Sequence, residues 1–167
     1  LINDLDKALG NDRLRFHGGV SYRHLLVAED GPEQLETEPP HDHTGQSVTE
    51  FWNVLLQSPL GETVKKAHQI LTEHEINLGR IKDGKRPANA IWLWGQGRAP
   101  AMPTLAEKYG ITGSLISAVD LLKGIGVYAG LKIINVEGAT GYIDTNYQGK
   151  VEAALGAIAD EDFVLVH

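Results

Sequence analysis

The sequence lacks cysteine, long apolar runs and an excess of basic residues. Without cysteine, disulfides, thiolate zinc sites and cysteine nucleophiles are excluded, and a cytoplasmic location is expected. No apolar run approaches the roughly 20 residues that a membrane-spanning helix needs. Because 22 Asp and Glu residues outnumber 15 Lys and Arg residues, the net charge is −7. A surface dedicated to nucleic acid, which would be strongly basic, is therefore not expected.

The 167 residues, of which 42% are hydrophobic, suffice for one compact core. Hydrophobic periodicity predicts helices over 1–10, 47–58, 61–78, 104–110, 119–129 and 145–158, and strands over 13–16, 21–28, 90–94, 114–118, 131–136 and 163–166. Strands and helices alternate regularly in the second half, which favours right-handed crossovers and parallel strands. We therefore expect an α/β fold with a mixed, largely parallel sheet flanked by helices.

Two helix starts carry the spacing of a capping box, in which Ser or Thr precedes Glu by three positions. These are Ser47 with Glu50 and Thr104 with Glu107. Gly110 is placed to end the second of these helices. On the long helix predicted over 61–78, His74 shares a stripe with apolar residues, so we expect a hydrogen-bonded core histidine rather than a metal ligand.

Both ends of the sequence are unusual for natural termini, which tend to be polar and frayed. The chain starts at Leu1 in an amphipathic helical pattern and stops at His167, directly after the apolar run 163–166. The pattern suggests a portion cut from a longer protein.

The segment 92–100 combines a predicted strand end with Gly95, Gly97 and Arg98. Glycines let backbone N–H groups approach an anion, and an arginine adds a bidentate fork for phosphate or carboxylate. The glycine spacing matches neither a dinucleotide fingerprint nor a P-loop. The segment is therefore either an anion pocket or a flexible turn with a solvated arginine.

The loop 39–45 contains two histidines around an aspartate, namely His41, Asp42 and His43. This spacing can chelate a metal, but it supplies too few ligands for a closed site. A substrate-contacting loop and a polar turn held by Asp42 remain as alternatives.

Cationic residues gather near the start of the chain, at Arg13, Arg15, His17, Arg23 and His24. In a protein of charge −7 this cluster suggests a small acidic ligand, although charges that solubilise an exposed edge strand would look the same. Lys123 at a later helix start could also reach an anion, or serve only as a surface charge.

Four segments together resemble the archaeal-type cofactor-independent phosphoglycerate mutases of the alkaline phosphatase superfamily: Tyr22–Val27, Pro40–Asp42, Ile91–Gly97 and Gly138–Tyr147. In that family a phosphatase-type core holds two divalent metal ions (Mn, Mg or Zn) and a serine nucleophile, and an inserted domain closes over the substrate. The resemblance implies that 1–137 is this inserted substrate-binding (lid) domain. Residues 138–167 would be the start of the C-terminal part of the core, packed on the same domain.

The resemblance implies interconversion of 3-phosphoglycerate and 2-phosphoglycerate through a metal-activated phosphoserine. His41 and Asp42 would hold glycerate hydroxyls or act in proton transfer. Arg23 and Arg98 would clamp the carboxylate or phosphate, with His17, His24 and Lys123 as further contacts. The nucleophile and main metal ligands would lie on the rest of the core, so the isolated chain is expected to bind no metal and be inactive. Neither nucleic acid nor a membrane is expected as a partner.

Three other interpretations stay open at this point. The chain could be a stand-alone binding module for small phosphorylated acids. It could be an autonomous metal hydrolase that uses His41, Asp42 and His43. It could also belong to a phosphatase or another phosphomutase of the same superfamily.

Overall fold

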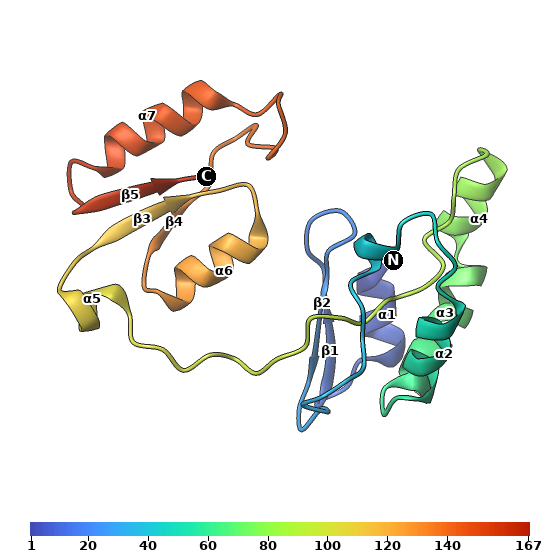
Figure 1. The fold of residues 1–167 in the computed structure, drawn as a ribbon. Helices are drawn as coiled ribbons and strands as arrows, with labels where there is room; N and C mark the ends of the chain where they lie inside the picture. The colour runs from blue at the N-terminus through green and yellow to red at the C-terminus, as the bar shows by residue number, and fades with distance from the viewer. The chain divides into compact units, whose positions relative to one another are not determined.

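The computed structural model describes residues 1–167, and the chain divides into two compact units, Leu1–Arg98 and Ala99–His167. Figure 1 labels the helices and strands of each unit. None of the helices combines the length and apolar character that crossing a bilayer requires.

The first unit packs an antiparallel strand pair against helices. Its elements are α1 (Ile2–Leu9), β1 (Leu14–His17), β2 (Leu25–Ala28), the 3₁₀ helix η1 (Pro40–His43), α2 (Thr49–Gln57), α3 (Gly61–Glu73) and α4 (Glu75–Lys82). The core is a cluster of buried side chains from α1, β1 and α3, namely Leu5, Phe16, Ala67 and Leu71. Ile91 packs against this cluster and so fixes the start of a later, irregular segment.

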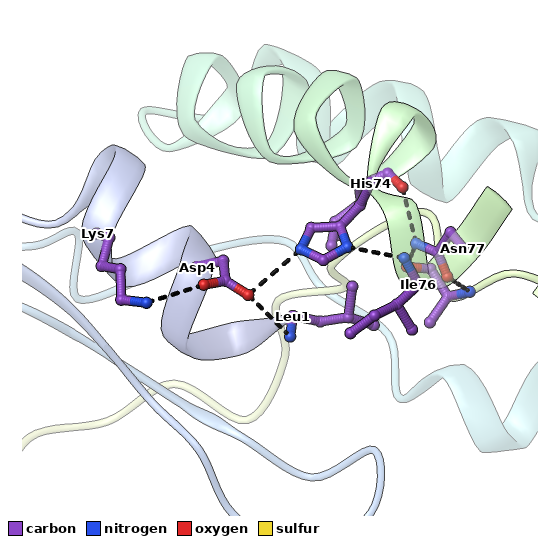
Figure 2. Close-up of polar contacts among 8 residues, drawn as sticks. Leu1, Asp4, Lys7, His74, Ile76 and Asn77 are labelled. Carbon is purple, nitrogen blue, oxygen red and sulfur yellow. Dashed lines mark hydrogen bonds and ion pairs between the residues drawn. The ribbon is translucent and has the colours of Figure 1, made fainter. Parts of the chain in front are cut away.

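The helix predicted over 61–78 is wrong in one respect, because it is broken at His74 into α3 and α4. His74 has a ψ of 134°, and its Nδ1 accepts a hydrogen bond from the Ile76 N–H at 3.2 Å. Its Nε2 lies 3.3 Å from Asp4 Oδ2 (Figure 2). The side chain thus serves both as N-cap of α4 and as a link to α1. The expectation of a hydrogen-bonded core histidine is confirmed.

The second unit is a small parallel α/β sheet with the strand order β4-β3-β5. Its elements are α5 (Leu105–Tyr109), β3 (Gly113–Ile116), α6 (Asp120–Tyr128), β4 (Lys132–Ile134), α7 (Tyr147–Ala157) and β5 (Phe163–Val166). The chain moves from β3 to β4 in one direction and from β4 to β5 in the other. Right-handed crossovers therefore place α6 and α7 on opposite faces of the sheet (Figure 1). All four residues of β3, the central strand, are buried.

The α/β class is confirmed, but the strands form two separate sheets instead of a single mixed one. The strand predicted over 90–94 is wrong: the segment has no strand partner and runs in irregular backbone. An apolar run reads as a buried strand from sequence, yet it becomes one only where a second strand is available for pairing.

Of the two predicted capping boxes, one is confirmed and one is wrong. Thr104 and Glu107 form both reciprocal bonds, and Gly110 ends α5 with a φ of 68°. The other helix, α2, begins one residue later than predicted, with Val48 at its N-cap and no side-chain cap bond. Ser47 instead faces the Thr49 hydroxyl at 3.2 Å.

The assignment of 1–137 and 138–167 to an insertion and a core stays a prediction.

Candidate functional site in paired loop segments

Residues 33–43 and 91–98 lie along each other in the first unit, and we call them the paired segments. Side chains of one segment bond to the backbone or side chains of the other. The Trp92 indole N–H donates to the Glu38 carbonyl at 2.8 Å. The Gln96 amide donates to the Leu35 carbonyl at 2.9 Å and accepts from the Thr37 hydroxyl at 3.0 Å. These bonds take the place of a strand ladder, so two irregular segments keep a defined register.

His41 lies on the paired segments and meets Trp94 edge-on, with ring centroids 5.2 Å apart and an interplanar angle of 71°. Its position follows from η1, whose first residue is Pro40 and whose Asp42 N–H donates to the Pro39 carbonyl at 3.1 Å. His41 Nε2 lies 3.7 Å from Asp42 Oδ1, and both side chains are more than 60% exposed. An imidazole and a carboxylate are therefore presented together to solvent, where hydroxyl groups of a ligand could reach both.

Arg98 is the last residue of the segment 91–98 and forms an ion pair with Glu33. Both side chains are exposed, and surface ion pairs of this kind contribute little net stability. Exchange of the Glu33 carboxylate for an incoming carboxylate or phosphate is therefore energetically easy. Arg98, His41 and Asp42, three of the predicted site residues, thus all lie on the paired segments, Arg98 beside Glu33 and His41 beside Trp94.

A second group of predicted residues lies on the β1–β2 hairpin. The Arg23 guanidinium stands 4.7 Å from the centroid of the Tyr22 ring and donates to the Tyr22 hydroxyl at 3.0 Å. His24 Nδ1 accepts from the Gly19 N–H at 3.2 Å, and burial lowers the pKa of His24 below its ordinary value. His17 is opposite Leu25 in the strand register. His24 is thus suited to be a neutral hydrogen-bonding group, whereas the Arg23 guanidinium next to it stays charged.

Lys123 belongs to the second unit, where it lies on α6. Its Nζ donates to Asn135 Oδ1 at 2.9 Å, just beyond the end of β4. The N-terminus of α5, the helix that follows the segment 92–100, is capped by Glu107, whose Oε2 accepts from the Thr104 N–H at 2.8 Å. Its backbone groups are thus occupied by the capping box.

The chain's own side chains do not form a metal centre. No group of three or more His, Asp or Glu residues lies close enough to hold an ion. In the 39–45 loop, the His43 ring packs on Phe51 with centroids 4.4 Å apart, whereas His41 meets Trp94. Each histidine thus has a different aromatic partner. The donor set therefore does not fit an independent metal site.

Sequence reasoning missed Gln96, Trp92 and Glu38 as organisers of the site. Gln96 uses both ends of its amide across a separation of about 60 residues, and no local pattern signals such a contact. The one signal in the sequence was that Leu35 and Thr37 interrupt a loop rich in charged residues, which indicates that they contact another part of the chain. In the structure both are half-buried.

The sequence of the chain is similar to known phosphoglycerate mutases. A family model described as 2,3-bisphosphoglycerate-independent phosphoglycerate mutase matches residues 1–77. The whole chain is 50% identical over 169 residues to the 2,3-bisphosphoglycerate-independent phosphoglycerate mutase of Methanosarcina barkeri. It is 47% identical over 174 residues to the probable enzyme of that name in Geobacter sulfurreducens. Along its whole length the chain is thus similar to members of this family. The resemblance read from the four sequence segments is confirmed.

Two solved structures are similar to this chain. The PH0037 protein of Pyrococcus horikoshii is 30% identical with a TM-score of 0.67, and the match covers 98% of this chain and 40% of that one. The cofactor-independent phosphoglycerate mutase of Thermoplasma acidophilum is 26% identical with a TM-score of 0.53, covering 98% and 46%. The chain spans 42% of the length of the Methanosarcina barkeri and Geobacter sulfurreducens relatives. The phosphoglycerate mutase family thus has longer members of which this chain matches a part.

Proposed function

We propose that this chain is the substrate-gripping part of a phosphoglycerate mutase that interconverts 3-phosphoglycerate and 2-phosphoglycerate. The observation that carries the proposal is the presence of Arg98 and the His41–Asp42 pair, all exposed, on the paired segments. Phosphoglycerate has a carboxylate, a phosphate and a free hydroxyl. An arginine fork suits the two anions, and an imidazole with a carboxylate suits the hydroxyl.

Roles follow from the chemistry of each side chain. Arg98 releases Glu33 and binds the carboxylate or phosphate. Arg23 supplies a second cation, and His41 with Asp42 hold the glycerate hydroxyl and move its proton. His17, His24 and Lys123 add outer contacts. Within the proposal, 1–137 form the lid and 138–167 begin the C-terminal part of the core, in a cytoplasmic enzyme.

The complete enzyme would use two divalent ions, which neutralise charge during phosphoryl transfer. In this proposal, their ligands and the serine nucleophile lie on sequence outside these residues. The isolated chain is therefore expected to show no mutase turnover with 3-phosphoglycerate and Mn²⁺. Turnover by the purified chain would contradict the placement of the nucleophile and metal ligands outside these residues.

Arg98→Ala in the complete enzyme tests the anion-binding role. Loss of a charge-assisted fork should raise the KM for 3-phosphoglycerate by roughly 10- to 100-fold. Arg86→Ala is the matched control, because Arg86 is an exposed arginine of the same unit outside the paired segments. Equal KM values for the Arg98→Ala enzyme and the control would remove Arg98 from the site. His41→Ala should lower kcat more than it raises KM, since it removes a group placed to handle a proton.

A further inference from the structure

His43 has an environment that packing alone does not explain. Its side chain is 19% exposed, and its ring lies against Phe51 of α2. Its Nε2 is buried and has no hydrogen-bond partner. The carboxylate that faces this nitrogen is that of Glu38, whose Oε2 lies 3.7 Å away, within ion-pair range but beyond a hydrogen bond.

A buried ring nitrogen without a hydrogen bond is unfavourable, so a phenylalanine would fill this space at lower cost. A buried polar atom of this kind in a folded protein calls for a specific reason. The reason available here is Glu38, because its side chain is 52% exposed and free to rotate toward the imidazole.

Glu38 also connects His43 to the opposite segment. Its backbone carbonyl accepts from the Trp92 indole at 2.8 Å, and Trp94 is two residues further along that segment. His41, two residues before His43 in η1, meets the Trp94 ring. Glu38 and His41 therefore contact neighbouring points of one segment, and His43 anchors the turn that carries His41.

We propose that Glu38 and His43 are positioning residues that hold His41 against Trp94. The inference rests on the proposed function, in which His41 contacts the substrate. Closure of the 3.7 Å gap to a hydrogen bond fixes η1 between α2 and the segment 91–98. The His41 ring is then presented in one orientation, which lowers the entropic cost of binding a hydroxyl.

The test uses NMR of the chain, with the ring-current shift of the His41 ring protons as readout. Trp94→Leu defines the part of the shift that comes from the indole. Glu38→Met and His43→Phe keep approximate size and packing but remove the carboxylate or the nitrogen. Each should reduce the Trp94-dependent shift, because loss of a half-exposed contact between carboxylate and imidazole shifts such an equilibrium by roughly two- to fivefold. The double variant should lose no more than either single variant.

Glu36→Met is the matched control, since Glu36 is an exposed carboxylate of the same loop two residues away. It should leave the His41 shift unchanged. An unchanged shift in Glu38→Met, or full additivity in the double variant, overturns the proposal. If His43→Phe does not fold, Glu38→Met decides alone. Because this readout needs no substrate, it is independent of the kinetic test of His41 in the complete enzyme.

Discussion

Asn77 shows how a single polar residue organises the first unit. It is fully buried on α4, and its amide donates to the Leu71 and Ala88 carbonyls at 2.7 and 2.9 Å. Its Oδ1 accepts from the Ala88 N–H at 2.9 Å. The side chain thus fixes the segment leading to 91–98 onto the end of α3. Asn77 thereby helps to position the segment 91–98.

Asn77→Ala should therefore destabilise the first unit. Three hydrogen bonds are lost and buried backbone groups lose their partner, which costs about 3 kcal/mol in the free energy of unfolding. Asn53→Ala, at an exposed helical position, is the matched control and should change stability by less than about 0.5 kcal/mol. Urea unfolding measures both. Similar values for the two variants would show that the Asn77 network is not stabilising.

The ionised Asp6 carboxylate stabilises the first unit, and this stabilisation is lost at acid pH. The Arg15 guanidinium and the Phe16 N–H bond to its carboxylate, and together they lower its pKa from 3.8 to about 2. Because the folded pKa is the lower one, the stabilisation is complete above the unfolded value near 4 and is lost as the pH falls through 2.

Asp6→Asn should accordingly flatten the fall of unfolding free energy between about pH 4 and pH 2. Glu29→Gln, an exposed carboxyl of the same unit, serves as control and should keep the wild-type slope. Urea unfolding at several pH values gives the slope. A slope in Asp6→Asn as steep as that of the wild type would assign the acid sensitivity to other groups.

At the scale of elements, local chemistry determined what sequence could predict. The Thr104 capping box and the Gly110 stop depend on neighbouring residues, and both were predicted correctly. The break between α3 and α4 was not predicted, because the His74 side chain that caps α4 also bonds to Asp4, 70 positions away, which no local pattern indicates. The segment 90–94 failed as a strand for the same reason, since strand formation depends on a distant partner.

Two glycines of α6 test how closely this helix packs on the sheet. A Cβ at Gly126 would lie 2.7 Å from Leu115 Cδ2 and 2.9 Å from Ile133 Cδ1, whereas a Cβ at Gly124 meets nothing within 4 Å. Gly126→Ala should cost about 1 kcal/mol or more, because overpacking exceeds the gain in helix propensity. Gly124→Ala should stabilise by about 0.5 to 1 kcal/mol. Thermal unfolding of both variants gives the comparison, and the reverse order would contradict the close contact.

At the scale of the whole molecule, residue types were easier to predict than their arrangement. His41 and Arg98 were recognisable because their side chains suit anions and hydroxyl groups. That they share the paired segments depends on Gln96 and Trp92, whose partners lie more than 50 residues away. The hairpin with Arg23 and the helix with Lys123 lie elsewhere in the chain, so their place in one site remains a prediction.

The measurement that tests the account most directly is an NMR titration of the ¹⁵N-labelled chain with 3-phosphoglycerate. The account predicts saturable shifts at the Trp94 indole, the Gln96 amide and His41, with the same shifts abolished in Arg98→Ala and kept in Arg86→Ala. Saturable shifts confined to other residues, or identical titrations of the wild type and Arg98→Ala, would contradict a substrate grip built on the paired segments.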